Sequence, residues 1–452
     1  MLAANALYLI AGTGVLWGIR GWRSLGELLR LLGLAYVLGV ATVATTATLL
    51  LIAGSGLGLA ITLAVPIACA AAGVALGHAR GRRFPRRLAS GGQRGERLLL
   101  VGIVSAALTV VLLEAFFRAA RLQGLVGYDA FAFWVPKAKA IYFFGGLDPQ
   151  LFRTLPGPSY PLLAPALQAL DFRLMGAADA TTIALQYWFL LAGFVGAAAG
   201  LLRPRVPLVL IWPFLGLATL MPELDKRMLN PQGDWPLDIF FALTALCLAV
   251  WVLDREPWLL GAAALLCGAL MATKREGQLL TACLVVGTLA ATWRTWRRSW
   301  PALVGVAAFG YLVNVPWHVW WTSRSLPSEN PDQGVGSLSA TASRVGPAFR
   351  VVLELLFSWH LWLVAVPLGL AAAAIAIGVR DYALPALYLL TTGLAVVGFT
   401  WILWSIPSLP LDTSQRTPIP RAVGSVVLLS IVFAPLLLSR VLARTRGAPA
   451  GA

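Results

Sequence analysis

The sequence predicts an all-α polytopic membrane protein with about thirteen transmembrane helices. The chain has 452 residues, of which 59% are hydrophobic. Only 12% are Asp, Glu, Lys or Arg, about half of the ~25% that soluble domains carry. Apolar stretches of about 18 or more residues recur along the chain, and each is long enough to cross a hydrocarbon core of ~30 Å. These observations exclude a soluble globular enzyme.

The expected helices follow one another along the chain. Windows of about 20 apolar residues are centred near residues 10, 40, 67, 107, 190, 214, 245, 265, 285, 310, 365, 394 and 429. The first stretch has its first cations, Arg20 and Arg23, after it rather than before it. This order is the reverse of a secretory signal, so we expect the stretch to remain as a membrane helix.

The formal net charge of +16 is concentrated in alternate loops. Those loops carry 20 of the 35 Lys and Arg residues but only five of the 19 acids. The cations are Arg20, Arg23, Arg30, seven arginines from Arg80 to Arg97, Arg203, Arg205, Arg255, Arg294, Arg297, Arg298, Arg380, Arg440, Arg444 and Arg446. The positive-inside rule assigns these loops to the cytoplasm, so the charge indicates membrane orientation rather than nucleic-acid binding. We expect function on the opposite face, which holds the longer, chemically mixed segments.

The first long outer segment contains residues 127–146, where aromatic side chains are interspersed with two lysines. A helix that begins at Asp129 or Ala130 would place the rings at the headgroup boundary, as amphipathic surface or re-entrant helices do. Lys137 and Lys139 would then reach polar or phosphate groups. The spacing alone leaves two roles open for Asp129, a helix cap or a part in the chemistry.

The second outer segment brings four carboxylates to the mouths of two expected spans: Glu223, Asp225, Asp234 and Asp238. Asp234 suits an N-cap, and Asp238 would share its helix face four residues later. Asp238 lies further into an apolar span, where carboxylates usually face a partner or a wet cavity. Glu223 and Asp225 have a simpler interpretation as solvated loop charges paired with the two cations that follow them.

The third outer segment, Thr273–Gly277, places three charges between two apolar stretches with very little loop. Lys274 and Arg275 could bind a phosphate, while Glu276 orients one of them or binds a sugar hydroxyl. The alternative is a tight polar turn that only reaches water. The last outer segment adds Arg416 within a proline-constrained stretch.

Neither a metal site nor a disulfide framework is indicated. The four cysteines all fall inside apolar stretches without a CxxC or Cys/His spacing: Cys69, Cys247, Cys267 and Cys283. They are expected to be buried small apolar side chains. The sequence requires no cofactor, and it leaves open whether a divalent metal assists.

Together, the outer segments resemble the membrane glycosyltransferases of the GT-C superfamily. The resemblance rests on motifs in a fixed order on one face: residues 128–139, YPLLAP at 160–165, GDWPLD at 233–238 opening a helix, and TKREG at 273–277. It is closest to bacterial members related to protein O-mannosyltransferases and to the lipid A aminoarabinose transferase. The similar region covers residues 120–290, with weaker support from Arg416.

The resemblance implies an inverting enzyme of the inner (plasma) membrane. It would transfer a sugar from a polyprenyl-phosphate donor to a glycan, lipid or protein acceptor on the extracytoplasmic face. Asp129 matches the family's loop carboxylate and becomes the candidate base. Lys274 and Glu276 match the family's Lys-x-Glu-Gly turn, and Asp234 or Asp238 matches its acidic helix start.

The resemblance also implies a GT-C-like fold in three parts. Residues 1–97 would form an N-terminal three-helix unit with an Arg-rich cytoplasmic loop, residues 98–300 the catalytic membrane core, and residues 301–452 the C-terminal helices with outer loops. The expected partners are the lipid-linked donor, the acceptor and membrane lipids, without nucleic acid. Two competing hypotheses remain, a secondary transporter or lipid flippase, and a non-catalytic membrane scaffold.

Overall fold

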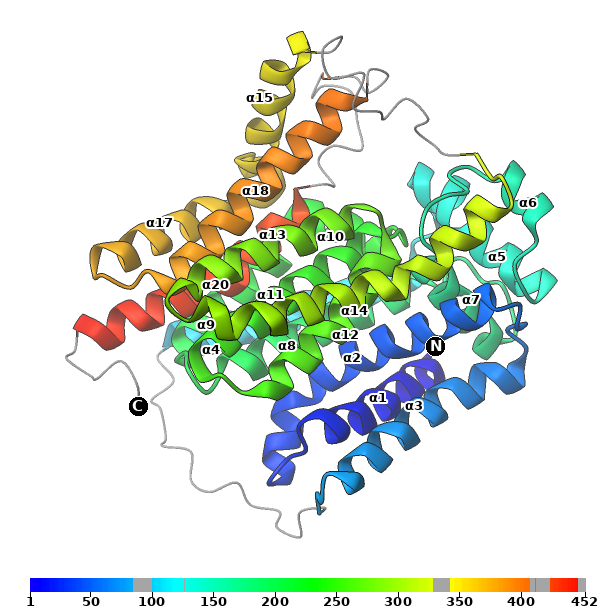
Figure 1. Cartoon of the computed structure of the whole chain (residues 1–452), viewed down its shortest axis with the longest axis horizontal. Coiled ribbons are helices and arrows are strands. Elements are labelled where there is room, and N and C mark those ends of the chain that lie inside the picture. Colours follow the sequence, from blue (N-terminus) through cyan, green and yellow to red (C-terminus); the bar gives the residue numbers. More distant parts are fainter. Residues whose placement is uncertain (84–99, 126, 328–341, 407–410, 412–422, 446–452) are drawn as a thin grey trace.

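The computed structural model describes residues 1–83, 100–125, 127–327, 342–406, 411 and 423–445 (Figure 1). These described residues form helices and no β-strand. Among them, nine helices are long and apolar enough to span a membrane, and there are eleven spans if each of two bent pairs counts as one. The predicted class, a polytopic helical membrane protein, is therefore confirmed.

The long helices follow the expected order along the chain. They are α1 (Leu2–Ile19), α2 (Leu25–Ile52), α3 (Leu59–Ala79), α4 (Leu100–Leu122), α8 (Ala184–Leu202), α11 (Asp234–Asp254), α14 (Trp296–Ser323), α18 (Ala383–Ser405) and α20 (Gly424–Thr445). One bent pair joins α9 (Leu208–Thr219) to α10 (Pro222–Leu229) at 64°. The other joins Ala342–Trp362, which contains α15 (Val345–Leu356) and α16 (Trp359–Trp362), to α17 (Ala365–Gly378) at 108°.

The two remaining expected spans are shorter helices, α12 (Pro257–Thr273) and α13 (Glu276–Ala291), of 17 and 16 residues. At 1.5 Å per residue they cover about 24–26 Å, short of a ~30 Å hydrocarbon core. Thirteen complete crossings therefore remain a prediction. The turn between these two helices is expected to sit below the membrane boundary, since α12 starts and α13 ends at the other side of the membrane.

The core of the bundle surrounds α11. In its most apolar stretch 89% of the residues are buried, and it packs against α8, α12, α13 and α20 (Figure 1). At the other extreme, only 11% of the corresponding stretch of α4 is buried. An apolar helix with so much exposed surface is suited to face lipid.

The N-terminal helices α1, α2 and α3 pack on one another through glycines. A Cβ on Gly12 would lie 1.7 Å from the Ala35 carbonyl oxygen, and one on Gly73 would lie 2.2 Å from the Gly14 carbonyl oxygen. Small residues of this kind let membrane helices approach closely. The three-helix unit is also fixed to the rest of the bundle, because α2 packs on α8 and Tyr8 donates to Asp171 Oδ1 at 2.8 Å.

The arginine-bearing turns meet at one end of the bundle, which we call the arginine end. Arg30 donates to the Gly200 carbonyl at 2.9 Å, Arg205 to Asp254 at 3.2 Å, and Arg255 to Ser299 at 3.2 Å. These contacts join the turns α1–α2, α8–α9, α11–α12 and α13–α14. The chain order then places the starts of α11 and α13 at the opposite end, which we call the outer end. The membrane side of each end stays a prediction.

The first outer segment folds into short helices at the outer end. They are a π-helical turn η1 (Ala130–Trp134), α5 (Val135–Phe144), α6 (Pro149–Thr154) and α7 (Leu163–Met175). The expected surface character holds at the end of α5, where Phe143 and Phe144 are exposed. It does not hold for α7, most of whose residues are buried within the bundle.

Candidate active site

Lys274 occupies the turn between α12 and α13, where its extended backbone interrupts the helices. Its Nζ donates to Asp234 Oδ1 at 2.9 Å and lies 3.0 Å from Glu276 Oε1. Burial opposes the charged form, but Asp234 and then Glu276 outweigh it and raise the pKa of Lys274 above its usual value. The turn therefore holds a permanent ammonium between two carboxylates. We call this trio the Lys274 turn.

The start of α11 supplies one of these carboxylates. Gly233 is the N-cap, and Asp234 is the first helical residue, so the prediction that Asp234 caps the helix is wrong. The indole ring of Trp134 covers Gly233, where a Cβ would lie 2.7 Å from the ring. Neither Trp134 nor Lys274 is near in sequence, so local spacing could not show that the Asp234 side chain accepts from a distant lysine.

Arg275 ties the Lys274 turn to the segment before α7. Its Nη2 donates to Ser159 Oγ at 2.6 Å, and the Ser159 carbonyl accepts from Trp317 Nε1 at 3.2 Å. The guanidinium also lies 5.8 Å from the ring of Tyr160 and 6.0 Å from that of Trp321. Neither Ser159 nor Trp317 could be predicted as a partner, because these contacts span more than 100 residues.

Lys137 is buried rather than placed at the headgroup boundary. Its Nζ donates to the Gly157 carbonyl and lies 3.7 Å from the centre of the Phe133 ring, with Trp134 and Tyr160 at 5.9 Å. A buried ammonium held by a carbonyl and aromatic faces fixes the loop around it. This geometry suits a positioning residue better than a phosphate ligand.

Lys139 lies near a different carboxylate. It lies close enough to Asp179 to contribute to the lowered pKa of that carboxyl, after the hydrogen bonds from Thr182 and Thr181. Asp179 belongs to the turn before α8. Lys139 is therefore not part of the Lys274 turn.

Asp129 immediately precedes η1 and is half-buried. Its side chain makes no capping hydrogen bond within the described residues, so the cap interpretation of Asp129 is not supported. The neighbouring Gly127 N–H donates to Asn230 Oδ1 at 2.7 Å, and Asn230 ends α10 just before α11. The segment that carries Asp129 is thus fastened beside the start of α11.

A second charged group lies one helical turn deeper. Asp238 pairs with Arg227 and accepts a hydrogen bond from Ser425, and all three side chains are buried. Arg227 also lies 3.8 Å from Glu223 and 4.9 Å from the centre of the Trp362 ring. Asp234 and Asp238 therefore lie near the start of the same helix, but Asp234 pairs with Lys274 whereas Asp238 pairs with Arg227. Sequence analysis had identified Asp238 but missed these partners.

The segment before α11 is helical rather than a loop. Within α10, Glu223 lies 3.8 Å from both Lys226 Nζ and Arg227 Nε, while Asp225 is half-buried. The interpretation of Glu223 and Asp225 as solvated loop charges is therefore wrong, since both are half-buried in a helix, whereas the expected pairing with Lys226 and Arg227 is confirmed for Glu223. Arg416 falls outside the described residues.

The outer end also holds a surface pocket of about 850 Å³. It is lined by the end of α2, by α6 and by the end of α14, where Trp320 stacks on Trp317 with ring centres 5.1 Å apart. Trp317 does not line the pocket, but it connects the lining residue Trp320 to the Ser159 carbonyl. In the described part of the chain, no three His, Cys, Asp or Glu side chains are grouped so as to hold a metal ion.

Comparison of the chain with protein-family models, curated proteins and solved structures found no match. The side chains at the outer end therefore indicate which reaction the protein could catalyse. Two cations, Lys274 and Arg275, lie next to each other there, with Asp234 and Glu276 in contact and Asp129 on the adjoining segment. Such a set can bind an anion and accept a proton from a hydroxyl group.

Proposed function

We propose that the protein is a membrane glycosyltransferase that uses a polyprenyl-phosphate sugar and acts on an acceptor at the extracytoplasmic face of the plasma membrane. The observation that carries this proposal is the Lys274 turn, with Arg275 beside it. The turn presents two cations at the outer end of a bundle of apolar helices. This is where the phosphate of a membrane-embedded donor would arrive.

The phosphate is the group that Lys274 and Arg275 would bind. A leaving monophosphate gains negative charge as the sugar departs, and fixed cations stabilise that charge most when water is excluded. In the free protein Asp234 and Glu276 hold the Lys274 ammonium in place. Arg275 uses one nitrogen on Ser159 and, as a guanidinium with five N–H donors, has others for a phosphate.

Asp129 would act as the base. The acceptor hydroxyl attacks the anomeric carbon, its oxygen forms the new glycosidic bond, and the proton passes to the Asp129 carboxylate. The bond from the anomeric carbon to the phosphate oxygen breaks, and the polyprenyl phosphate leaves with the electron pair. A single displacement of this kind inverts the anomeric centre. Lys274 and Arg275 can neutralise the leaving group without a cofactor.

The short helices give the donor a place to lie. Because α12 and α13 are only 17 and 16 residues long, the Lys274 turn would be recessed below the membrane boundary. A polyprenyl chain could then stay in lipid or between helices while its phosphate reaches Lys274. A soluble nucleotide donor would need no such position.

A lipid flippase or secondary transporter is the second candidate. Two bent helix pairs and the buried Arg227–Asp238 pair favour it, since transporters use broken helices and intramembrane charges along their substrate path. The two candidates differ in covalent chemistry. A flippase moves the lipid-linked sugar across the bilayer with its sugar–phosphate bond intact, whereas a transferase breaks that bond.

The test uses the purified full chain in vesicles that contain a polyprenyl-phosphate sugar labelled in the sugar, with a membrane extract as the source of acceptor. We expect label to leave the polyprenyl phosphate and enter the acceptor fraction, and expect Lys274→Ala to reduce this transfer. Label that crosses the bilayer but stays on the lipid would instead identify a flippase. No movement of label with any hexose or pentose donor would contradict both candidates.

A further inference from the structure

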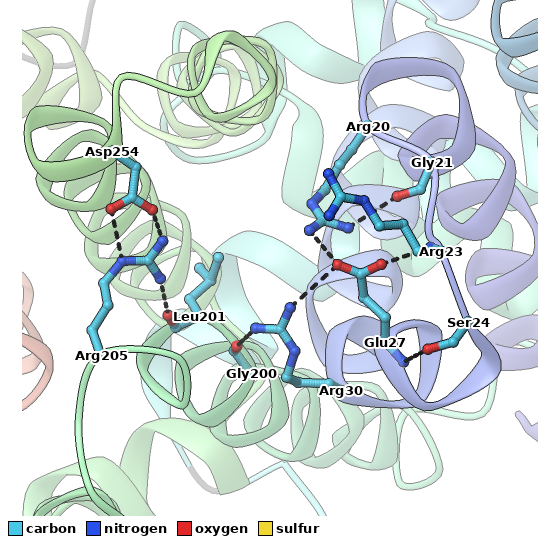
Figure 2. Close-up of polar contacts among 10 residues, drawn as sticks. All are labelled: Arg20, Gly21, Arg23, Ser24, Glu27, Arg30, Gly200, Leu201, Arg205 and Asp254. Carbon is cyan, nitrogen blue, oxygen red and sulfur yellow. Dashed lines mark hydrogen bonds and ion pairs between the residues drawn. The ribbon is translucent and has the colours of Figure 1, made fainter. Parts of the chain in front are cut away.

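A group of arginines surrounds one carboxylate at the arginine end (Figure 2). Glu27, in the first turn of α2, pairs with Arg20 and lies 3.6 Å from Arg30, and its Oε2 accepts from the Arg23 backbone N–H at 2.7 Å. Ser24 caps the same helix by accepting from the Glu27 N–H at 3.2 Å. We call Arg20, Arg23 and Arg30 the Glu27 cluster.

The cluster has more positive charge than its carboxylate can balance. Arg20 and Arg30 lie close enough for their guanidiniums to repel each other, and Glu27 offsets only part of this repulsion. Arg205 and Asp254 pair separately beside the cluster, which leaves Glu27 as the acid inside it (Figure 2). A second anion would relieve this repulsion.

Parts of the cluster are still open to a ligand. The Arg23 guanidinium is exposed and has no ion pair among the described residues. The Arg20 Nε makes no hydrogen bond to any described residue but is buried, so Arg20 adds positive charge to the site rather than an accessible donor. Guanidinium groups of this kind suit a phosphate, whose oxygens accept paired, charge-assisted hydrogen bonds.

The surroundings are those of a membrane surface. The Arg20 guanidinium lies 5.0 Å from the centre of the Trp258 ring, and Trp22 packs edge-on against Trp17 at 4.8 Å. Tryptophan is typical of the membrane–water boundary. On the same first turns of α2, Leu25 and Leu29 are exposed and apolar. Since residues two apart on a helix do not face the same way, these leucines lie on the side of α2 away from Glu27. Together with the rings they place the arginines at the level of lipid headgroups.

We propose that the Glu27 cluster binds the phosphate of an anionic phospholipid. The cations fit a phosphate, and the tryptophan and the exposed leucines place that phosphate at the membrane surface, whereas free phosphate would use only the cations. The site is at the opposite end of the bundle from the Lys274 turn. It is therefore independent of the proposed transferase activity.

Native mass spectrometry of the purified full chain in detergent can measure the affinity for phosphatidylglycerol and phosphatidylcholine. We expect clear preference for phosphatidylglycerol. Arg23→Gln should weaken its binding about fivefold, the equivalent of about 1 kcal/mol for one basic residue near the surface. Arg294→Gln is the matched control, because Arg294 is also exposed at the arginine end but belongs to the α13–α14 turn.

Glu27→Gln gives an effect of opposite sign. It removes the carboxylate that competes for the arginines while its side-chain oxygen can still accept from the Arg23 N–H, so phosphatidylglycerol should bind more tightly. Equal losses in Arg23→Gln and Arg294→Gln, or no preference over phosphatidylcholine, would overturn the proposal. Displacement of the lipid by inorganic phosphate at equal concentration would also overturn it and would indicate a free-anion site.

Discussion

The two ends of the molecule hold their charges in different ways. At the arginine end the cations outnumber the acids, and several are exposed. At the outer end Lys137 and Arg227 are buried, and Lys274 is almost enclosed between two carboxylates. The first arrangement follows from composition, whereas the second needs particular partners from distant helices.

The two kinds of charge have different roles: the exposed arginines orient the chain in the membrane, and the buried charges fix the structure or act on a ligand. Exposed arginines in short loops orient the chain in a membrane and attract anionic lipids, and each can be exchanged at small cost. Buried charges are expensive unless each has a partner, so a protein keeps them where they fix a structure or act on a ligand. Substitutions at the outer end should therefore have much larger effects.

The largest effect is expected at the deeper charged group. Arg227→Met would leave the buried Asp238 carboxylate with Ser425 alone, and it should lower the free energy of unfolding by about 3–5 kcal/mol. Denaturant unfolding in detergent micelles measures this loss. Adding Asp238→Asn removes the unpaired charge and should restore most of the stability. A loss below about 1 kcal/mol in the single variant would show that the pair is solvated.

Lys274→Ala should have the next largest effect, on donor use. Removal of one preorganised donor to a developing charge typically costs about 10²–10³ in rate, and we expect a loss of this size in kcat/KM for the lipid-linked donor. Kinetics of sugar transfer measure it. Because Asp234 and Glu276 raise the pKa of Lys274 above its usual value, loss of its charge should not limit activity near neutrality.

A double variant distinguishes a loss of transfer activity from a loss of folding stability. Lys274→Ala removes the ammonium that pairs with Asp234, so Lys274→Ala with Asp234→Asn should regain stability without regaining transfer. Full activity in Lys274→Ala would remove this residue from the site.

The smallest effect is expected at the arginine end. Arg205 and Asp254 form an ion pair that is partly exposed on both sides. Arg205→Gln should cost only about 0.2–1 kcal/mol in unfolding free energy, with less effect at high salt. The same micelle unfolding experiment applies. A loss as large as that of Arg227→Met would contradict the contrast between the two ends.

Composition and hydropathy were sufficient for the fold class but not for all elements. Apolar stretches located the helices, because in a bilayer the backbone must satisfy its own hydrogen bonds. The helix α10 was missed as a charged loop. Its signal was present, since Pro222 begins it, acids fill its first turn and bases its last. The shortness of α12 and α13 was hidden by windows of fixed length.

Residues of the candidate site could be identified from the sequence, but the contacts between them could not. The charges of Thr273–Gly277 and the acidic start of α11 were identified from their positions at span ends. The Lys274–Asp234 pair joins residues 40 apart, and the Arg275–Ser159 contact joins residues 116 apart. Such partners depend on how distant helices pack together, and this packing cannot be predicted from the spacing of residues in a single sequence. The buried position of Lys137 was missed for the same reason.

Asp129 provides the most direct test of the proposed transferase. Asn keeps the size and the hydrogen-bond acceptor but cannot take a proton at neutral pH, and the Asp129 side chain makes no cap bond to lose within the described residues. The measurement is sugar transfer by wild type, Asp129→Asn and Asp129→Glu at matched protein levels, with donor binding measured alongside. The account predicts that Asp129→Asn loses roughly 10²–10⁴ in turnover with donor binding nearly intact, and that Asp129→Glu keeps partial activity. Wild-type turnover in Asp129→Asn would contradict it.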